Sequence, residues 1–166
     1  MDNTELRIQT ATHAEIPLLL TFIKELASYE KLLENVGVTE ERLRKTLFGE
    51  KPRGHAIIAY YGESPVAFSI YFFNLSTFDG RPGLYVEDIF VRPAFRGSGV
   101  GRKLFEYLSA RAREEGCSRI ELSVLNWNED AIQFYKKLGG EPVNGWTVIR
   151  FSEKAIDDLD ERLGLI

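Results

Sequence analysis

Residues 91–104, VRPAFRGSGVGRKL, join a strand-like run to a helix-like run through three glycines. The preceding residues 83–91, GLYVEDIFV, are rich in aromatic and β-branched side chains, which is typical of a strand. From Gly99 to Glu115 apolar side chains recur every four residues, which predicts an amphipathic helix. Glycines directly before a helix leave its first N–H groups open to an anion, so the loop predicts a phosphate-bearing ligand.

Two common phosphate-binding loops do not match this spacing. A Walker A loop requires Lys followed by Ser or Thr after its last glycine, whereas Gly101 is followed by Arg102 and Lys103. A dinucleotide fingerprint fits Gly97 and Gly99, but Gly101 arrives one residue early. The dinucleotide interpretation is therefore weak, and the glycines alone also fit a plain turn between strand and helix.

Hydrophobic periodicity predicts the helices and strands on both sides of the loop. The patterns predict, in chain order, a strand at 6–9, helices at 12–30 and 39–48, a hairpin around 62–65, the strand and helix that flank the glycine loop, a strand at 119–124, a helix at 128–140, a strand at 145–152 and a short acidic helix at 155–164. This order predicts a mixed α/β fold whose sheet contains one right-handed βαβ crossover, built around the glycine loop.

The composition limits the classes of partner. The length of 166 residues, 44% of them hydrophobic, fits one globular domain over residues 1–166. A net charge of −4 argues against nucleic acid, because phosphate contacts need a basic surface. We expect no membrane partner and a cytoplasmic protein, since no apolar run is long enough for a span and residues 1–10 lack a secretion signal. We expect no metal, because His13 and His55 lack ligand spacing.

The glycine loop and a later helix match two motifs of one family. Arg96, Gly99 and Gly101 fit R/Q-x-x-G-x-G/A. The pattern N-x-x-A-x-x-x-Y-x-x-x-G is matched by Asn128, Ala131, Tyr135 and Gly139. Over nearly all its length the chain resembles the GCN5-related N-acetyltransferase (GNAT) superfamily. The resemblance implies the GNAT fold, a mixed and mostly antiparallel sheet of six to seven strands flanked by helices, with acetyl-CoA bound at the βαβ crossover.

The resemblance also implies which residues hold acetyl-CoA. In the family the glycine loop binds the pyrophosphate through backbone N–H groups, here from Gly97 to Arg102, while Arg96 adds charge or braces the loop. The strand before the loop offers backbone groups to the pantetheine arm and the thioester. The implied cofactor-binding residues are Ile89, Phe90, Val91, Arg96, Gly97, Ser98, Gly99, Val100, Gly101, Arg102, Asn128, Ala131 and Tyr135.

Tyr135 stands where the family has its general acid. A phenol with a pKa near 10 can protonate a departing thiolate of comparable basicity. The helix alone allows another interpretation, because Ala131, Tyr135 and Leu138 also fit an apolar face in which Tyr135 is a core aromatic. An ordinary surface cation is the corresponding alternative for Arg96.

Glu87 and Asp88 are adjacent carboxylates inside the otherwise apolar strand LYVEDIFV. Strand alternation sends neighbouring side chains to opposite faces, so at least one carboxylate is buried, paired or directed into a cleft. A carboxylate can attract a protonated amine and help to remove its proton. A structural pair with an arginine is the alternative for Asp88.

The segments ELASYEKL, LYVEDIFV and WNEDAIQFYKKLGG resemble the spermidine/spermine acetyltransferase branch of the superfamily. This resemblance implies that Glu87 assists deprotonation of the amine and that the chain forms a homodimer. The substrate-binding residues that it implies are Tyr29, Glu30, Glu87, Asp88 and Trp146. Tyr29 and Glu30 equally fit a solvated end of the helix predicted at 12–30.

One departure from that branch leaves the acceptor open. Asn144 stands where the branch has an acidic substrate residue, which weakens the case for a long polycation. The expected acceptor is therefore the primary amine of a polyamine, a diamine or a lysine-like amino acid such as thialysine. An amine of a peptide or protein, and a CoA-binding module without catalysis, remain alternatives.

Overall fold

The structure is a computed structural model that describes residues 5–165. The described residues divide after Leu125 into two compact units, residues 5–125 and 126–165, and each is described by itself. The first unit contains, in chain order, β1 (Leu6–Thr10), η1 (His13–Glu15), α1 (Ile16–Tyr29), η2 (Leu33–Asn35), α2 (Glu40–Phe48), β2 (His55–Tyr61), β3 (Ser64–Ser76), β4 (Arg81–Val91), η3 (Pro93–Phe95), α3 (Val100–Glu114) and β5 (Ile120–Leu122). The helices and strands expected over this range are confirmed.

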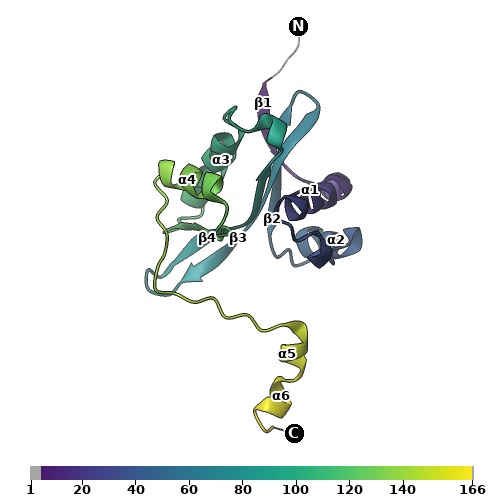
Figure 1. Ribbon diagram of the computed structural model, residues 1–166, viewed down its shortest axis with the longest axis vertical. Helices are drawn as coiled ribbons and strands as arrows, with labels where there is room; N and C mark the ends of the chain where they lie inside the picture. Colours follow the sequence, from purple (N-terminus) through teal and green to yellow (C-terminus); the bar gives the residue numbers. More distant parts are fainter. Residues whose placement is uncertain (1–4, 166) are drawn as a thin grey trace. The chain divides into compact units, whose positions relative to one another are not determined.

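One sheet with the strand order β1-β2-β3-β4-β5 forms the centre of the first unit. The first four strands pair antiparallel, and β5 pairs parallel to β4. The chain therefore leaves β4, passes through α3 and returns as β5, which confirms the βαβ crossover around the glycine loop. In Figure 1, α1 and α2 lie on one side of the sheet and α3 lies on the other.

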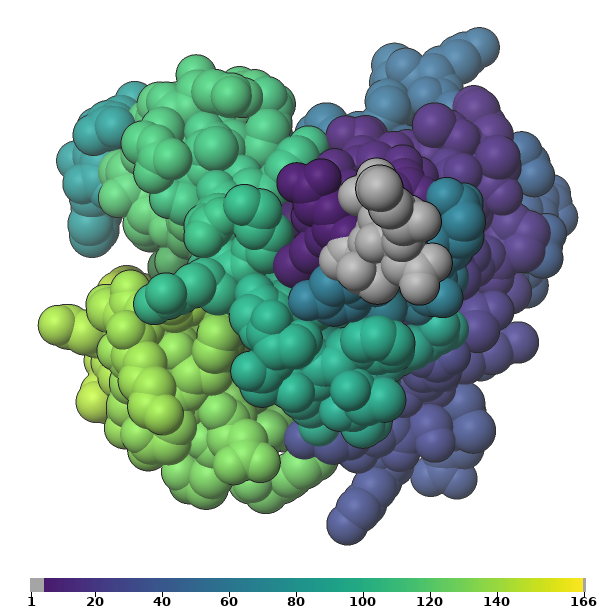
Figure 2. Space-filling view, turned by 90° about the horizontal axis from the view of Figure 1, so that it is seen from above, coloured from purple at the N-terminus to yellow at the C-terminus, as the bar shows by residue number. Residues whose placement is uncertain are grey.

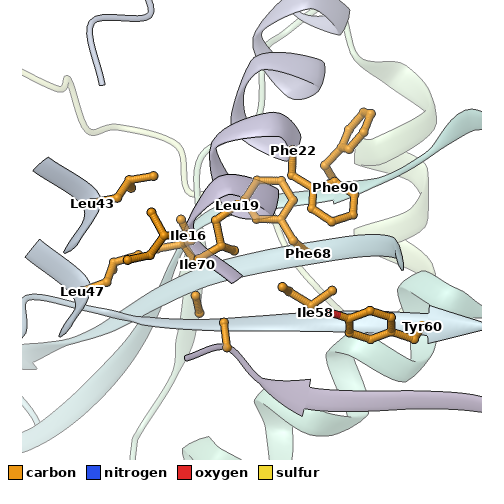
Figure 3. Close-up of a cluster of buried hydrophobic side chains, with 12 residues drawn as sticks. Ile16, Leu19, Phe22, Leu43, Leu47, Ile58, Tyr60, Phe68, Ile70 and Phe90 are labelled. Carbon is orange, nitrogen blue, oxygen red and sulfur yellow. The ribbon is translucent and has the colours of Figure 1, made fainter. Parts of the chain in front are cut away.

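Two hydrophobic clusters fill the two sides of this sheet. On the first side, residues such as Ile16, Leu19 and Phe22 of α1 pack against Phe68 and Phe90 of the sheet (Figure 3). On the other side, α3 buries the four-residue repeat that its sequence predicted, at Val100, Leu104, Leu108 and Ala112. Since both faces of β3 and β4 are covered, these strands hold the surrounding elements at fixed positions.

Polar side chains begin both helices on the first side. The hydroxyl of Thr12 accepts a hydrogen bond from the N–H of Ala14, and the Glu15 carboxylate accepts one from the N–H of Thr12. This capping box starts η1, which leads directly into α1. At α2 the Thr39 hydroxyl accepts a hydrogen bond from the N–H of Arg42 and caps the helix.

The second unit contains α4 (Glu129–Lys137), α5 (Glu153–Asp157) and α6 (Leu159–Arg162). The helix predicted at 128–140 is confirmed, and its Asn128 side chain accepts a hydrogen bond from the N–H of Ala131. The acidic segment at 155–164 forms parts of two short helices instead of one. The single domain predicted over residues 1–166 stays a prediction.

The strand predicted at 145–152 is wrong. Residues 140–152 form neither helix nor strand, so the sheet has five strands among the described residues and not six to seven. Alternation of apolar side chains gives a segment two faces, but a strand also needs a neighbouring backbone with which to pair. In residues 145–152 no such pairing forms, and Trp146, Val148 and Phe151 are exposed.

Candidate active site

A β-bulge interrupts β4 at its two adjacent carboxylates. Ile70 of β3 pairs with Asp88, while the next residue, Tyr71, pairs with Val86, so Glu87 is the extra residue. The bulge reverses the alternation of β4, because Val86 packs on the α3 side before it and Ile89 packs there after it. Asp88 therefore shares the α1 side with Phe90, and Glu87 is exposed.

The carboxyl group of Asp88 is half-buried and strongly perturbed. Burial, together with the nearby negative charges of Glu87 and Glu30, raises the pKa of Asp88 to about 6. Buried Ser69 holds the backbone beside the bulge, because its hydroxyl donates a hydrogen bond of 2.8 Å to the carbonyl of Asp88. No ion pair to Asp88 occurs within residues 5–165, so the expected alternative of an arginine partner is not observed.

The C-terminal turn of α1 meets this part of β4. The ring of Tyr29 lies with its centroid 6.2 Å from that of Phe90. The neighbouring Glu30 is half-buried, and burial raises the pKa of its carboxyl group. Tyr29, Glu30 and Asp88 thus come from distant parts of the sequence to one region, as the resemblance implied for a substrate site.

An arginine–carboxylate pair fixes α1 against the same strand. The Arg92 guanidinium donates to both carboxylate oxygens of Glu25, at 2.9 and 2.8 Å, and to the carbonyl of Pro65 at 2.7 Å. It also lies 4.6 Å above the ring centroid of Phe22. Bidentate pairing restricts both side chains, so this contact sets the position of α1 relative to the end of β4.

The glycine loop has the backbone geometry that an anion site requires. Gly97 and Gly99 have φ angles of 77° and 90°, which favour glycine, and added Cβ atoms would meet open space. Gly99 begins α3 without a side-chain cap, and the first turn of α3 carries no acidic residue. The segment lies at the surface, teal beside the purple N-terminal residues in Figure 2. The first N–H groups of α3 are therefore suited to a phosphate group.

Arg96 is directed toward α1. Its Nε donates a hydrogen bond of 3.0 Å to the carbonyl of Val91. Its guanidinium lies 4.3 Å above the ring centroid of Tyr29 and 5.6 Å from that of Phe90. These contacts favour the bracing role that was expected as one of two roles for Arg96.

The remaining predicted site residues belong to the second unit. Asn128 caps α4, Ala131 lies in its first turn, and Tyr135 lies in its last turn with its ring 5.5 Å from that of Phe134. Trp146 follows in the segment without regular structure, where it is 79% exposed. The first unit thus gathers one part of the predicted site, and Tyr135 and Trp146 lie on the other unit.

Three residues that shape the site were not identified from the sequence. Ser69 occupies an inward position on β3, and a polar residue inside an apolar strand is the signal that could have identified it. The pairing of Glu25 with Arg92 has no local signal, because 67 residues separate them.

Within residues 5–165, no group of three or more His, Cys, Asp or Glu could hold a metal ion. Across the same range no helix is both long and apolar enough to cross a membrane.

Comparison with known proteins identifies the family. The model of the acetyltransferase (GNAT) family matches residues 22–140, which include α1, β4, the glycine loop and α4. The chain belongs to the GNAT family. The predicted family is thus confirmed, and with it the class of enzyme, an N-acetyltransferase that uses acetyl-CoA.

Several relatives cover nearly the whole chain. The thialysine N-epsilon-acetyltransferase of Bos taurus is 37% identical over 163 residues, 92% of this chain and 95% of that protein. The Caenorhabditis elegans protein of the same name is 37% identical over 95% of this chain and 97% of its own length. The human spermidine/spermine N(1)-acetyltransferase-like protein 1 is 29% identical over 92% of this chain and 23% of that protein.

Solved structures agree on the fold. An integron cassette protein from the V. cholerae mobile metagenome superposes with a TM-score of 0.78 at 22% identity, covering 97% of this chain and 99% of that one. A ribosomal-protein-alanine N-acetyltransferase from Brucella melitensis superposes with a TM-score of 0.72 at 22% identity, over 89% of this chain and all of that chain. At these identities the likeness concerns the fold alone.

Proposed function

We propose that this enzyme transfers an acetyl group from acetyl-CoA to the primary amine of a small cationic metabolite. The observation that carries the proposal is the bulge at Glu87, which turns Asp88 toward Glu30 and Tyr29. The half-buried carboxyl groups of Asp88 and Glu30, with the exposed Glu87 beside them, favour a cationic ligand, because an opposite charge offsets the cost of burying the first two. The thialysine acetyltransferases among the relatives support the same class of acceptor.

In this proposal the first unit holds the donor through backbone atoms. The N–H groups from Gly97 to Arg102 bind the pyrophosphate of acetyl-CoA. The positive φ angles of Gly97 and Gly99 and the lack of a side-chain cap at the start of α3 support this role. Ile89, Phe90 and Val91 of β4 offer backbone groups to the pantetheine arm. The bound donor supplies the acetyl group as a thioester.

The proposed proton transfers use Glu87 and Tyr135. Glu87, directly or through water, accepts a proton from the ammonium group so that the nitrogen has a free electron pair. A bond then forms between this nitrogen and the acetyl carbon while the carbon–sulfur bond breaks. Tyr135 gives its proton to the sulfur, the acylated nitrogen releases its second proton, which restores the Tyr135 hydroxyl through solvent, and Glu87 returns its proton to solvent. The products are an N-acetyl amine and the free thiol of CoA. Both roles are proposals.

The acceptor that we favour is short. Thialysine, a diamine and a lysine-like amino acid each carry a primary amine that Glu30, Glu87 and Asp88 attract in this proposal. Trp146 is proposed as a further substrate-binding residue. Asn144 is neutral, so one charge that would favour a long polyamine is missing. We also propose a homodimer in the cytoplasm, as the resemblance to the polyamine branch implies.

An acceptor panel tests the proposal. Thiol release from acetyl-CoA is measured with thialysine, diamines, polyamines and a lysine-containing peptide, and we expect the highest kcat/KM for a small cationic amine. Tyr135→Phe should lower kcat by about a hundredfold or more if Tyr135 is the general acid. The matched control, Tyr107→Phe, removes a hydroxyl from α3 and should leave kcat unchanged.

Three results would count against the proposal. Highest activity on the peptide would favour a protein acetyltransferase. No thiol release with any amine would favour a CoA-binding module without catalysis. Undiminished turnover in Tyr135→Phe would remove that residue from the general-acid role.

A further inference from the structure

We propose that Arg96 is a positioning residue that couples the donor loop to the acceptor region through Tyr29. Binding of a pyrophosphate-bearing donor at the loop and binding of a cationic amine beside Tyr29 then affect each other. The inference rests on the proposed function for the identity of the acceptor. Its first test measures CoA binding alone and needs no amine.

The contacts of Arg96 connect three elements. Its Nε donates to the Val91 carbonyl at the end of β4, at 3.0 Å, which fixes the plane of the guanidinium. That plane lies 4.3 Å above the ring centroid of Tyr29, in the last turn of α1. Arg96 itself directly precedes Gly97, the first glycine of the loop. A displacement of the Tyr29 ring is therefore transmitted to the residue that begins the loop.

Charge pairing does not explain the position of Arg96. Within residues 5–165, no carboxylate lies within ion-pair distance of the Arg96 guanidinium, whereas the Arg92 guanidinium forms an ion pair with the Glu25 carboxylate. The positions of the Tyr29 and Phe90 rings, 4.3 and 5.6 Å from the guanidinium carbon, together with the Val91 carbonyl, account for its orientation. The side chain is exposed, so its charge keeps most of its hydration while the aromatic contact sets its direction.

The rest of the loop is held by its own short contacts. The Ser98 hydroxyl donates to the Phe95 carbonyl at 2.6 Å, and the N–H of Arg96 donates to the Pro93 carbonyl at 3.2 Å. Because these contacts stay within residues 93–98, the Arg96 side chain is the link that the structure describes from the loop start to α1. The loop and the Tyr29 ring are thus suited to move together.

Thermodynamic coupling between two sites is reciprocal. If Arg96 transmits the position of Tyr29, loss of the Tyr29 ring weakens donor binding even though Tyr29 lies in the proposed acceptor region. A cation–π contact at an exposed site corresponds to a change of about three- to fivefold in a dissociation constant. The same factor applies to acceptor binding when the donor is present.

The first experiment measures the dissociation constant of CoA by titration calorimetry, with no amine present. Tyr29→Leu and Arg96→Gln should each weaken CoA binding by about three- to fivefold, and the double variant should be no weaker than the stronger single variant. Tyr29→Phe keeps the ring and should weaken CoA binding less than Tyr29→Leu does. Tyr29→Met, whose flexible unbranched side chain adapts to the space that the ring leaves, replaces Tyr29→Leu if that variant does not fold.

Additive losses in the double variant would overturn the coupling, because Arg96 and Tyr29 would then act independently. An unchanged CoA affinity in Tyr29→Leu, or in Tyr29→Met in its place, would also overturn it. A second readout is the KM of the amine, which should rise in Arg96→Gln more than kcat falls. If CoA binding is coupled but no amine is acetylated, the proposed function fails and the coupling stands.

Discussion

Helix α1 contacts β4 and the segment after it at two levels, each with an arginine above an aromatic ring. At the first level, Arg92 lies above Phe22 and pairs with the Glu25 carboxylate, in surroundings that are buried or half-buried. At the second level, Arg96 lies above Tyr29 with no carboxylate partner within residues 5–165, and Asp88 carries a raised pKa nearby. The first level satisfies its charges and stabilises the fold. The second leaves charge available for a ligand.

Among the variants that compare the two levels, Phe22→Ala is expected to change the free energy of unfolding most. Phe22 is fully buried and stacks on Phe68 with ring centroids 5.2 Å apart, so its loss should lower the free energy of unfolding by about 3–5 kcal/mol. Tyr29→Ala removes a half-buried ring and should cost about half as much. Urea unfolding followed by circular dichroism measures both. Equal losses would mean that the two levels support the fold equally.

The next largest effect is a difference in stability loss between variants of the two arginines. Arg92→Gln leaves the Glu25 carboxylate half-buried without its bidentate partner and should lower the free energy of unfolding by about 2 kcal/mol. Arg96→Gln breaks an exposed cation–π contact and should cost less than about 1 kcal/mol. Thermal unfolding of both variants in the same buffer tests the difference. A greater loss in Arg96→Gln would reverse the assignment.

Asp88 gives a pH dependence of opposite sign to that of an ordinary paired carboxylate. Its pKa rises from 3.8 to about 6 on folding, so its effect on stability is most favourable below pH 3.8 and is lost as the pH rises through 6. Asp88→Asn stays neutral and should raise the free energy of unfolding at pH 7.5 by on the order of 1–3 kcal/mol.

Unfolding measured from pH 4 to pH 8 tests this prediction. The stability gain of Asp88→Asn over the unaltered chain should be small at pH 4 and should grow toward pH 7.5. A constant gain over this range would mean that Asp88 titrates normally.

The smallest effect on stability is expected at the bulge itself. Glu87 is exposed, so Glu87→Gln should change the free energy of unfolding by less than about 0.5 kcal/mol. If Glu87 assists deprotonation, the variant should nevertheless lose acetylation rate, most strongly at lower pH where more amine is protonated. An unchanged pH–rate profile would remove Glu87 from that role and leave it as the residue that forms the bulge.

The part of the fold with local sequence signals could be predicted. The glycines at 97–101 and the four-residue repeat from Val100 to Ala112 define a loop and a helix without reference to the rest of the chain. The bulge could not be predicted, because it depends on how Ile70 and Tyr71 pair with β4. The strand at 145–152 was predicted from alternation alone, which does not reveal whether a partner backbone is present.

The site residues also divide into those that the sequence predicts and those that only the folded chain brings together. Tyr29, Glu30 and Asp88 were predicted as substrate-binding residues from the family resemblance. They lie near one another in the first unit, and their role stays a prediction. The pair of Glu25 and Arg92 was not predicted, since contacts across 67 residues leave no periodic pattern. Arg96 was predicted with two roles, and only its ring contact with Tyr29 favours one of them.

The most direct test of the central claim is a competition in one reaction. Acetyl-CoA is offered together with equal concentrations of thialysine, a diamine, spermidine and a lysine-containing peptide, and acetylated products are measured by mass spectrometry over time. The account predicts that an acetylated small cationic amine forms first and at the highest rate. Formation of acetylated peptide alone, or of no acetylated amine, would contradict it.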